Sequence, residues 1–119
     1  VSNVVSPSSL KLDKKGVPLH YSHCYKGKAT AYYAKPGTKT STGRTVKVGY
    51  VAVDPSKIPY GSKLYIMTPD GSYVYGYAIA ADTGAFVHNG SGIIADLFMP
   101  SREACRKFGA RTVLIYVLN

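Results

Sequence analysis

The stretch YAIAADTGAFVHNGSGIIADLF, residues 77–98, decides how this chain folds. Two apolar runs each carry one aspartate, and a glycine-rich loop joins them. The first run ends a predicted strand over 72–81, the loop covers 82–92, and the second run predicts a strand over 93–98. Asp82 directly follows the first run, whereas Asp96 lies inside the second. The pattern therefore places two carboxyl groups against the core of a β-rich domain.

Outward from this stretch, alternation of apolar and polar residues predicts more strands. A TPDG turn at 68–71 precedes the strand over 72–81 and indicates a hairpin. A short helix is predicted over 101–108, and Ser101 is suited to cap it. The remaining predicted strands cover 27–33, 45–53, 62–67 and 111–118. Six short strands with one helix favour a mainly β, closed barrel, because closure removes exposed strand edges.

The N-terminal residues 1–22 hold no hydrophobic period and are punctuated by proline, serine and glycine. They are predicted to be an extended linker or tether, which leaves residues 23–119 as the folded domain. The chain begins at Val1 without a signal peptide, so we expect a mature piece or a fragment.

Length and composition exclude several classes of protein. A chain of 119 residues with 45% hydrophobic and 18% charged residues fits one globular domain and not a disordered chain. No apolar run approaches the roughly 20 residues of a membrane-spanning helix. Two cysteines are too few for a disulfide framework or a four-thiolate zinc site. Cys24 and Cys105 could pair in an exported protein, although spacing alone does not show that they touch.

The formal net charge of +9 indicates an anionic partner. Nucleic acid, an anionic cell wall and a membrane surface are the alternatives. The basic residues are spread along the chain rather than clustered, which disfavours a nucleic-acid stripe.

Only six acidic residues are available for acid–base chemistry. Asp13 falls in the predicted linker, Asp70 in the hairpin turn, and Glu103 in the first turn of the helix. The other three carboxylates, which lie within or at the ends of apolar strands, are Asp54, Asp82 and Asp96. Burial raises the pKa of a carboxyl group, and a like charge nearby raises it further. Such a group can stay protonated near neutral pH and act as an acid.

Structural roles compete with chemistry at two of these aspartates. Asp54 precedes Pro55 and is suited to organise a turn, and Asp82 is suited to an Asx turn that opens the following loop. Asp96 has no local turn to cap, so it is the first choice for a functional acid.

Other chemistries are disfavoured. His23 and Cys24 are adjacent, and a strand would point them to opposite faces. The histidines and cysteines lack the spacing of a metal site, and His88 meeting an aspartate is a minor alternative. We expect no cofactor, because the chain has no phosphate-binding glycine loop and no G-x-S-x-G nucleophile motif.

Six ordered motifs make the chain resemble the 3D domain, a family named for three aspartates. The motifs are GKATAY, VAVDP, IPYGSKLYI, ADTG, ADLF and FGARTV, and the resemblance covers residues 26–118. Bacterial stationary-phase muralytic proteins and the catalytic region of membrane-bound lytic transglycosylase A carry this domain. The resemblance implies a six-stranded double-psi β-barrel that acts on peptidoglycan, at the bond between N-acetylmuramic acid (MurNAc) and N-acetylglucosamine (GlcNAc).

The resemblance also assigns residues. It matches the family's aspartates to Asp54, Asp82 and Asp96, and favours Asp96 as the acid and base. Thr30 and Gly84 match positions in the family's groove. The segment after the DTG motif is longer than in the family and brings His88 near the family's lysine, so the sugar-binding groove is expected to differ there. Tyr32, Tyr33 and Tyr60 are further candidates for stacking on sugars.

These inferences combine into two hypotheses. The first is a secreted or cell-wall-associated bacterial lytic transglycosylase that uses one aspartate, with a hydrolase as its variant. The second is a non-catalytic module that binds peptidoglycan and localises a cell-wall protein. Both hypotheses expect peptidoglycan strands and anionic cell-wall polymers as partners, and neither expects nucleic acid or a membrane span.

Overall fold

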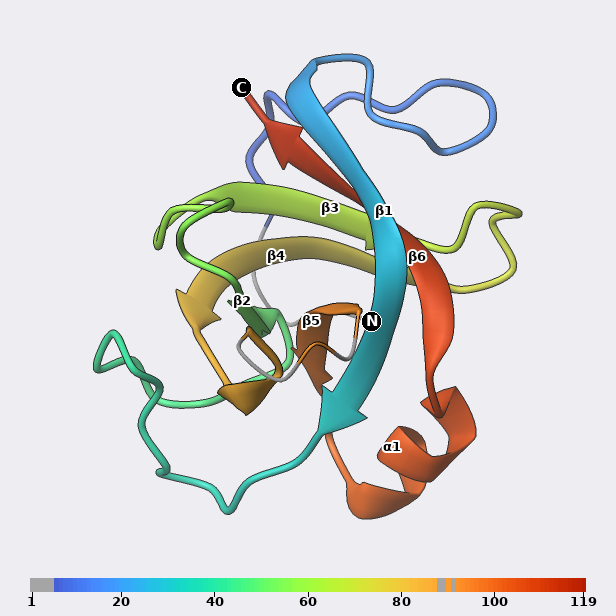
Figure 1. The fold of residues 1–119 in the computed structure, drawn as a ribbon. Helices are drawn as coiled ribbons and strands as arrows, with labels where there is room; N and C mark the ends of the chain where they lie inside the picture. Colours follow the sequence, from blue (N-terminus) through green and yellow to red (C-terminus); the bar gives the residue numbers. More distant parts are fainter. Residues whose placement is uncertain (1–5, 88–89, 91) are drawn as a thin grey trace.

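The computed structural model describes residues 6–87, 90 and 92–119, and shows strands wrapped into a barrel with one short α-helix at its edge (Figure 1). In chain order, the elements are β1 (Tyr21–Tyr32), β2 (Tyr50–Val53), β3 (Lys63–Met67), β4 (Val74–Asp82), the 3₁₀ turn η1 (Ala85–Val87), β5 (Ile93–Phe98), α1 (Arg102–Phe108) and β6 (Arg111–Leu118).

The six strands close into one barrel with the order β1-β5-β2-β4-β3-β6. The pairs β1–β5 and β2–β4 are parallel, and the other four neighbouring pairs are antiparallel. This mainly β architecture, with six strands and one short helix, confirms the predicted fold class, and its topology is that of a double-psi β-barrel.

Alternation along each strand builds the core. In β2, Val51 and Val53 are fully buried in the barrel interior, and in β5, Ala95 and Leu97 are buried there as well. Residues between these positions therefore face outward, because successive side chains of a strand point to opposite faces. This parity places Asp96 on the outside of the barrel.

One tyrosine connects three segments inside the core. The side chain of Tyr75 in β4 is fully buried. Its hydroxyl donates to the carbonyl of Phe98 over 2.8 Å and accepts from the amide of Gly49 over 2.8 Å. It thereby satisfies two backbone groups, one just before β2 and one at the end of β5.

The predicted strands over 93–98 and 111–118 match β5 and β6 residue for residue. The observed strand β1 starts earlier than the strand predicted over 27–33. It begins at Tyr21 and pairs with β6 from Tyr21 to Ala29. The strand predicted over 45–53 is shorter, since only Tyr50–Val53 joins the sheet. Its first part alternates as predicted, but Gly49 has φ 112° and turns the chain just before β2.

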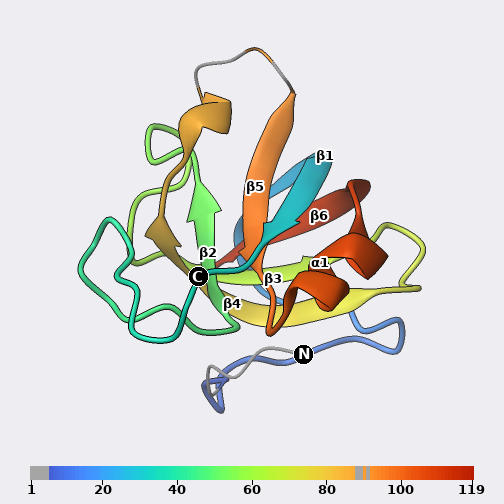
Figure 2. The same cartoon turned by 90° about the horizontal axis from the view of Figure 1, so that it is seen from below.

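Local signals also set the helix and the hairpin turn. Ser101 caps α1 by accepting a hydrogen bond from the amide of Ala104 at 3.1 Å, as predicted. In the TPDG turn, Gly71 has φ 75° and donates its amide to the Thr68 carbonyl. The helix packs beside β1 at one end of the barrel (Figure 2).

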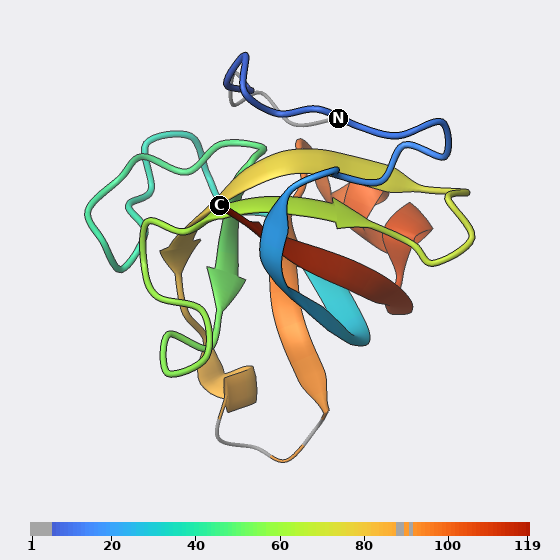
Figure 3. The same ribbon diagram turned by 90° about the horizontal axis from the view of Figure 1, so that it is seen from above.

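The N-terminal segment from residue 6 onward runs along the outside of the barrel (Figure 3). Leu10 and Val17 pack on a second apolar cluster, which β3 and β6 supply with Tyr65, Met67 and Tyr116. This part of the chain therefore contacts the barrel, and its role as a linker between domains stays a prediction.

Replacing Tyr75 with phenylalanine tests the buried hydroxyl. The Tyr75→Phe variant should unfold about 1–3 kcal/mol more easily, because the Gly49 amide and the Phe98 carbonyl would lose their partner. Urea unfolding followed by circular dichroism measures this. The Tyr60→Phe variant, which alters an exposed ring, should unfold like the wild type. Equal midpoints for all three proteins would contradict the assigned role of Tyr75.

Candidate active site on the outer face of the barrel

Four residues line up across four neighbouring strands. Ala52 of β2 pairs with Asp82 of β4 on one side and with Asp96 of β5 on the other. Asp96 in turn pairs with Thr30 of β1. Side chains at paired positions lie on the same face of a sheet. The register thus brings two carboxyl groups and a hydroxyl together around the small side chain of Ala52.

A bulge makes this alignment. Val51 pairs with Ala80, whereas the next residue, Ala52, pairs with Asp82, so β4 contains one extra residue at this point. Ala78 and Ala80 both face the core, and strict alternation would have sent Asp82 inward as well. The extra residue turns Asp82 to the outer face, beside Asp96.

Asp96 is half-buried, and the Thr30 hydroxyl donates to its Oδ1 over 3.0 Å. Burial raises the pKa of Asp96, and the negative charge of Asp82 raises it as well, while the hydrogen bond from Thr30 opposes them. The net shift is upward, so Asp96 keeps its proton to a higher pH than an exposed aspartate. This is the behaviour that the sequence predicted for a group acting as an acid.

Asp82 is held by a loop that comes from far away in the sequence. Its Oδ1 accepts from the amide of Ser41 at 3.0 Å, from the Ser41 hydroxyl, and from the amide of Thr83 at 2.9 Å. The Thr42 hydroxyl donates to the carbonyl of Ala81 at 2.8 Å, which fixes the loop beside the end of β4. The bond from Thr83 reaches the residue next to Asp82, whereas an Asx turn bonds the amide two residues on, so this bond is not the predicted Asx turn. Ser41 was missed, because it lies 41 residues from its partner and no local signal marks it.

Asp54 lies outside this row. Its Oδ1 accepts from the amide of Ser56 at 2.9 Å and from the Ser56 hydroxyl at 2.6 Å, and its carbonyl accepts from the amides of Lys57 and Ile58. These bonds form the turn after β2 that the sequence offered as the structural alternative.

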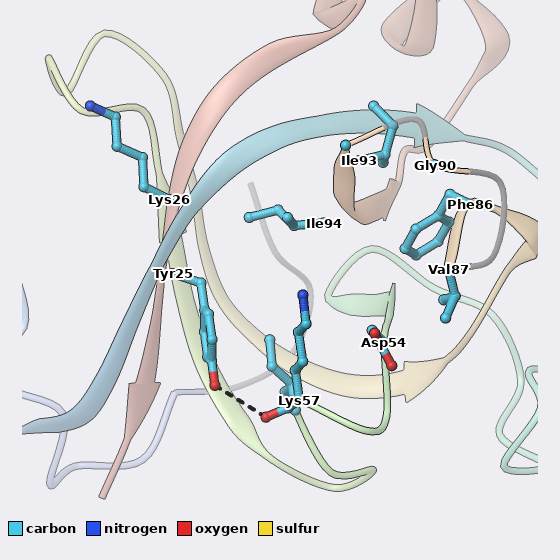
Figure 4. Close-up of a pocket in the computed structure, with 11 residues that line it drawn as sticks. Tyr25, Lys26, Asp54, Lys57, Phe86, Val87, Gly90, Ile93 and Ile94 are labelled. Atoms are coloured by element: carbon cyan, nitrogen blue, oxygen red, sulfur yellow. Dashed lines mark hydrogen bonds between the residues drawn. The ribbon is translucent and has the colours of Figure 1, made fainter.

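Asp54 borders two hollows on the surface of the barrel. The first has a volume of about 310 Å³ and is lined by side chains from β1, η1, β5 and the turn after β2 (Figure 4). Phe86, Val87 and Ile94 give it apolar walls, and Lys57 stands opposite them. The second hollow, of about 420 Å³, is bordered by Thr83, which follows Asp82. Asp82 and Asp96 border neither hollow, so the hollows approach the row of carboxylates without containing it.

Two glycines make room for side chains of the first hollow. A Cβ on Gly27 would lie 2.7 Å from Cγ2 of Ile94, and one on Gly84 would lie 3.1 Å from the ring of Phe86. Gly84, which the resemblance placed in a groove, therefore lets Phe86 close over the backbone of the DTG motif. Tyr60 is 43% exposed and borders neither hollow. His88 lies outside the described residues.

Tyr32 occupies the outer face near the carboxylates. Its ring meets that of Phe98 edge-on, with centroids 5.4 Å apart. Its hydroxyl is buried and has no hydrogen-bond partner among the described residues. Burial raises the pKa of this hydroxyl, and the charges of Asp82 and Asp96 raise it further. The sequence predicted that Tyr32 stacks on sugars but gave no sign that its hydroxyl is buried within the electrostatic influence of two carboxyl groups.

The two cysteines are unbonded in the structure: Cys24 is exposed on β1, and Cys105 is half-buried on α1. Their pairing stays a prediction. Within the described residues, no three His, Cys, Asp or Glu side chains gather in a way that could hold a metal ion. No helix in the described part of the chain is long and apolar enough to cross a membrane.

Comparison with known proteins agrees with the resemblance seen in the sequence. Residues 49–119 match the family model of the 3D domain. The cell wall-binding protein YocH of Bacillus subtilis (strain 168) is 40% identical over 98 residues, which cover 76% of this chain and 31% of YocH. YabE of the same strain, named as a candidate cell wall shaping protein, is 40% identical over 84 residues, which cover 67% of this chain and 18% of YabE. The chain thus spans less than a third of the length of either relative. This chain belongs to the 3D domain family.

Proposed function

We propose that this domain acts at the bacterial cell wall, where it cleaves peptidoglycan strands as a lytic transglycosylase with Asp96 as acid and base. The observation that carries the proposal is the placement of Asp96, a half-buried carboxyl group that shares the outer face of the barrel with Asp82 across β2. Burial and the charge of Asp82 raise its pKa. Membership of the 3D family and similarity to two cell-wall proteins support the location.

The chemistry needs one carboxyl group that works twice. Protonated Asp96 gives its proton to the oxygen of the MurNAc–GlcNAc bond, and the bond from C1 of MurNAc to this oxygen breaks. The resulting Asp96 carboxylate takes the proton of the MurNAc C6 hydroxyl, whose oxygen bonds to C1. The products are a 1,6-anhydro-MurNAc end and a free GlcNAc hydroxyl, and no water is consumed.

The other two aspartates receive different roles in this proposal. Burial raises the pKa of Asp96 most, and the charge of Asp82 adds to this; the same negative charge is placed to stabilise the positive charge that develops on the sugar ring. Asp54 shapes the turn that borders both hollows. Thr30 orients the carboxyl group of Asp96 through its 3.0 Å hydrogen bond.

Hydrolysis is the variant of this reaction. A hydrolase needs either a second carboxylate that activates water or one that bonds to the sugar. Oδ1 of Asp82 already accepts three hydrogen bonds and Asp54 stands outside the row, which favours the lytic route.

A non-catalytic module that binds the wall is the second candidate. Two observations favour it: the name of the relative YocH and a basic loop next to Asp82. Residues 35–47 contain four Lys or Arg and no acidic residue. Val46 and Val48 anchor this loop in the core.

The loop presents its cations in a defined arrangement. The Arg44 guanidinium lies 5.4 Å and the Lys47 ammonium 5.1 Å from the centroid of the Tyr50 ring. A hydrogen bond with Arg44, together with both positive charges, lowers the pKa of Tyr50. We propose that this cluster attracts the phosphate or carboxylate groups of anionic wall polymers, whichever of the two functions the domain has.

Loss of the acid tests the catalytic proposal. Digestion of purified peptidoglycan, followed by mass spectrometry, should give 1,6-anhydro-muropeptides with the wild type. The Asp96→Asn variant should release them at least about a hundredfold more slowly, because an amide cannot donate and retake the proton. The Glu103→Gln variant makes the same chemical change on the exposed side of α1 and should be fully active. Reducing-end products from the wild type would indicate a hydrolase, and no products at all would favour the binding module.

The pH profile tests the coupling between the two carboxyl groups. Asp96 acts as an acid only while it is protonated, so activity should fall as the pH rises through its pKa. The Asp82→Asn variant keeps an oxygen for Ser41 and Thr83 but removes the charge that raises this pKa. Its alkaline limb should therefore lie at lower pH than that of the wild type, in initial rates measured across the pH range. An unchanged limb would contradict the coupling.

Sedimentation with insoluble walls tests the basic loop. The double variant Arg44→Gln, Lys47→Gln should bind walls that carry anionic polymers about tenfold more weakly at low salt, and the difference should shrink as salt increases. The variant Lys14→Gln, Lys15→Gln loses the same charge in an exposed turn and should bind almost like the wild type. Equal losses in both would mean that only the overall charge matters.

A further inference from the structure

The Tyr32 hydroxyl is a buried polar group with no acceptor for its hydrogen among the described residues. Most buried polar side chains in folded proteins have a partner, because leaving water without one destabilises the fold. By contrast, the buried hydroxyl of Tyr75 makes two hydrogen bonds of 2.8 Å. The position of Tyr32 therefore needs an explanation other than stability.

Contacts on both sides fix the side chain. Tyr32 is the last residue of β1, and its backbone pairs with Phe98 of β5. Its carbonyl accepts from the amide of Met99 at 2.9 Å, and its ring packs edge-on against Phe98. Two positions earlier on the same strand, and on the same face, Thr30 donates to Asp96.

Toward a negatively charged group, the Tyr32 hydroxyl can act only as a hydrogen-bond donor. Burial raises its pKa, and the charges of Asp82 and Asp96 both raise it further. The phenol therefore keeps its proton while Asp96 titrates. A neutral phenol held within the field of two carboxylates is a ready hydrogen-bond donor to either of them.

The two carboxyl groups differ in how well they are supplied with donors. In the described structure, Asp82 accepts three hydrogen bonds through Oδ1, whereas Asp96 accepts one, from Thr30. One hydrogen bond stabilises a half-buried carboxylate only weakly when it forms near a second negative charge. The need arises only when Asp96 has lost its proton.

We propose that Tyr32 is a positioning residue whose hydroxyl donates a hydrogen bond to the carboxylate of Asp96 after proton transfer. This inference rests on the proposed role of Asp96 as acid and base. Thr30 and Tyr32 together would then give the ionised group two donors from one strand. This role explains why the Tyr32 hydroxyl stays buried without a partner among the described residues, since the carboxylate that accepts its hydrogen bond forms only during the reaction.

Three titratable groups face Asp96 from the elements around it, and each must be separated in the test. Asp82 comes from β4 and Tyr32 from β1, and both share an electrostatic interaction with Asp96. Cys105 comes from α1, where burial and the charge of Asp96 raise the pKa of its thiol. The Cys105→Ser variant removes this last group and serves as the background for all proteins compared.

Carbon-13 NMR titration of the Asp96 carboxyl group, assigned with Asp96→Asn, measures the effect without requiring activity. Loss of a donor to the carboxylate should move the titration of Asp96 to higher pH in Tyr32→Phe. Tyr33→Phe is the matched control, because Tyr33 also packs on Phe98 but comes directly after the end of β1. The proposal is wrong if Asp96 titrates identically in Tyr32→Phe and in its background protein.

Stability and turnover complete the test. Removing an unpaired hydroxyl should leave the urea midpoint of Tyr32→Phe unchanged or higher, while turnover falls about tenfold with KM unchanged. A purely structural hydroxyl would instead lower the midpoint and leave the rate per folded molecule intact, and this result would overturn the proposal. If the wild type releases no anhydro products, the proposed function fails, but the NMR titration still decides whether Tyr32 acts on Asp96.

Discussion

The candidate site depends on the pairing of one small residue with both of its neighbouring strands. Ala52 of β2 lies opposite Asp82 on one side and Asp96 on the other. These aspartates belong to strands that are separated in sequence by a loop and in the barrel by β2. No ion pair or metal is needed to bring them together, because the backbone hydrogen bonds of the sheet do so. The methyl group of Ala52, which is 4% exposed, takes up little of the space between them.

The surroundings of the three family aspartates separate their roles. All three follow or interrupt apolar strands, and the sequence presents them alike. In the structure, Asp54 is bonded within its own turn, Asp82 is bonded to a distant loop, and Asp96 is left with one hydroxyl and a nearby negative charge. A carboxyl group with few donors and partial burial favours its neutral form. These surroundings support the proposal that Asp96 is the acid, which the sequence favoured because of its place inside an apolar strand.

Local patterns predicted the parts of the molecule that local forces determine. The bounds of β5 and β6, the cap at Ser101 and the turn at Gly71 are all set by residues close together in sequence. The early start of β1 depends on pairing with β6 at the far end of the chain, so the pattern near residue 21 did not reveal it. The contacts of Ser41 and the burial of the Tyr32 hydroxyl likewise arise only when distant segments meet. The three aspartates and Thr30 were thus predictable from the sequence, whereas Ser41 and the burial of the Tyr32 hydroxyl were not.

The bulge in β4 lets one strand meet two requirements: alanines that face the core and an aspartate that faces outward. Up to Ala80, the strand stays in phase with the barrel interior, and two residues later it presents a carboxyl group to the outside. Because of this bulge, the packing of the alanines in the core and the placing of Asp82 on the outer face do not constrain each other. Loss of the bulge without loss of a residue would return Asp82 to the interior phase, whereas deletion of Ala81 would restore regular alternation and keep the aspartate outside. The spacing between Ala80 and Asp82 therefore matters to the face on which the carboxyl group lies as much as the aspartate itself.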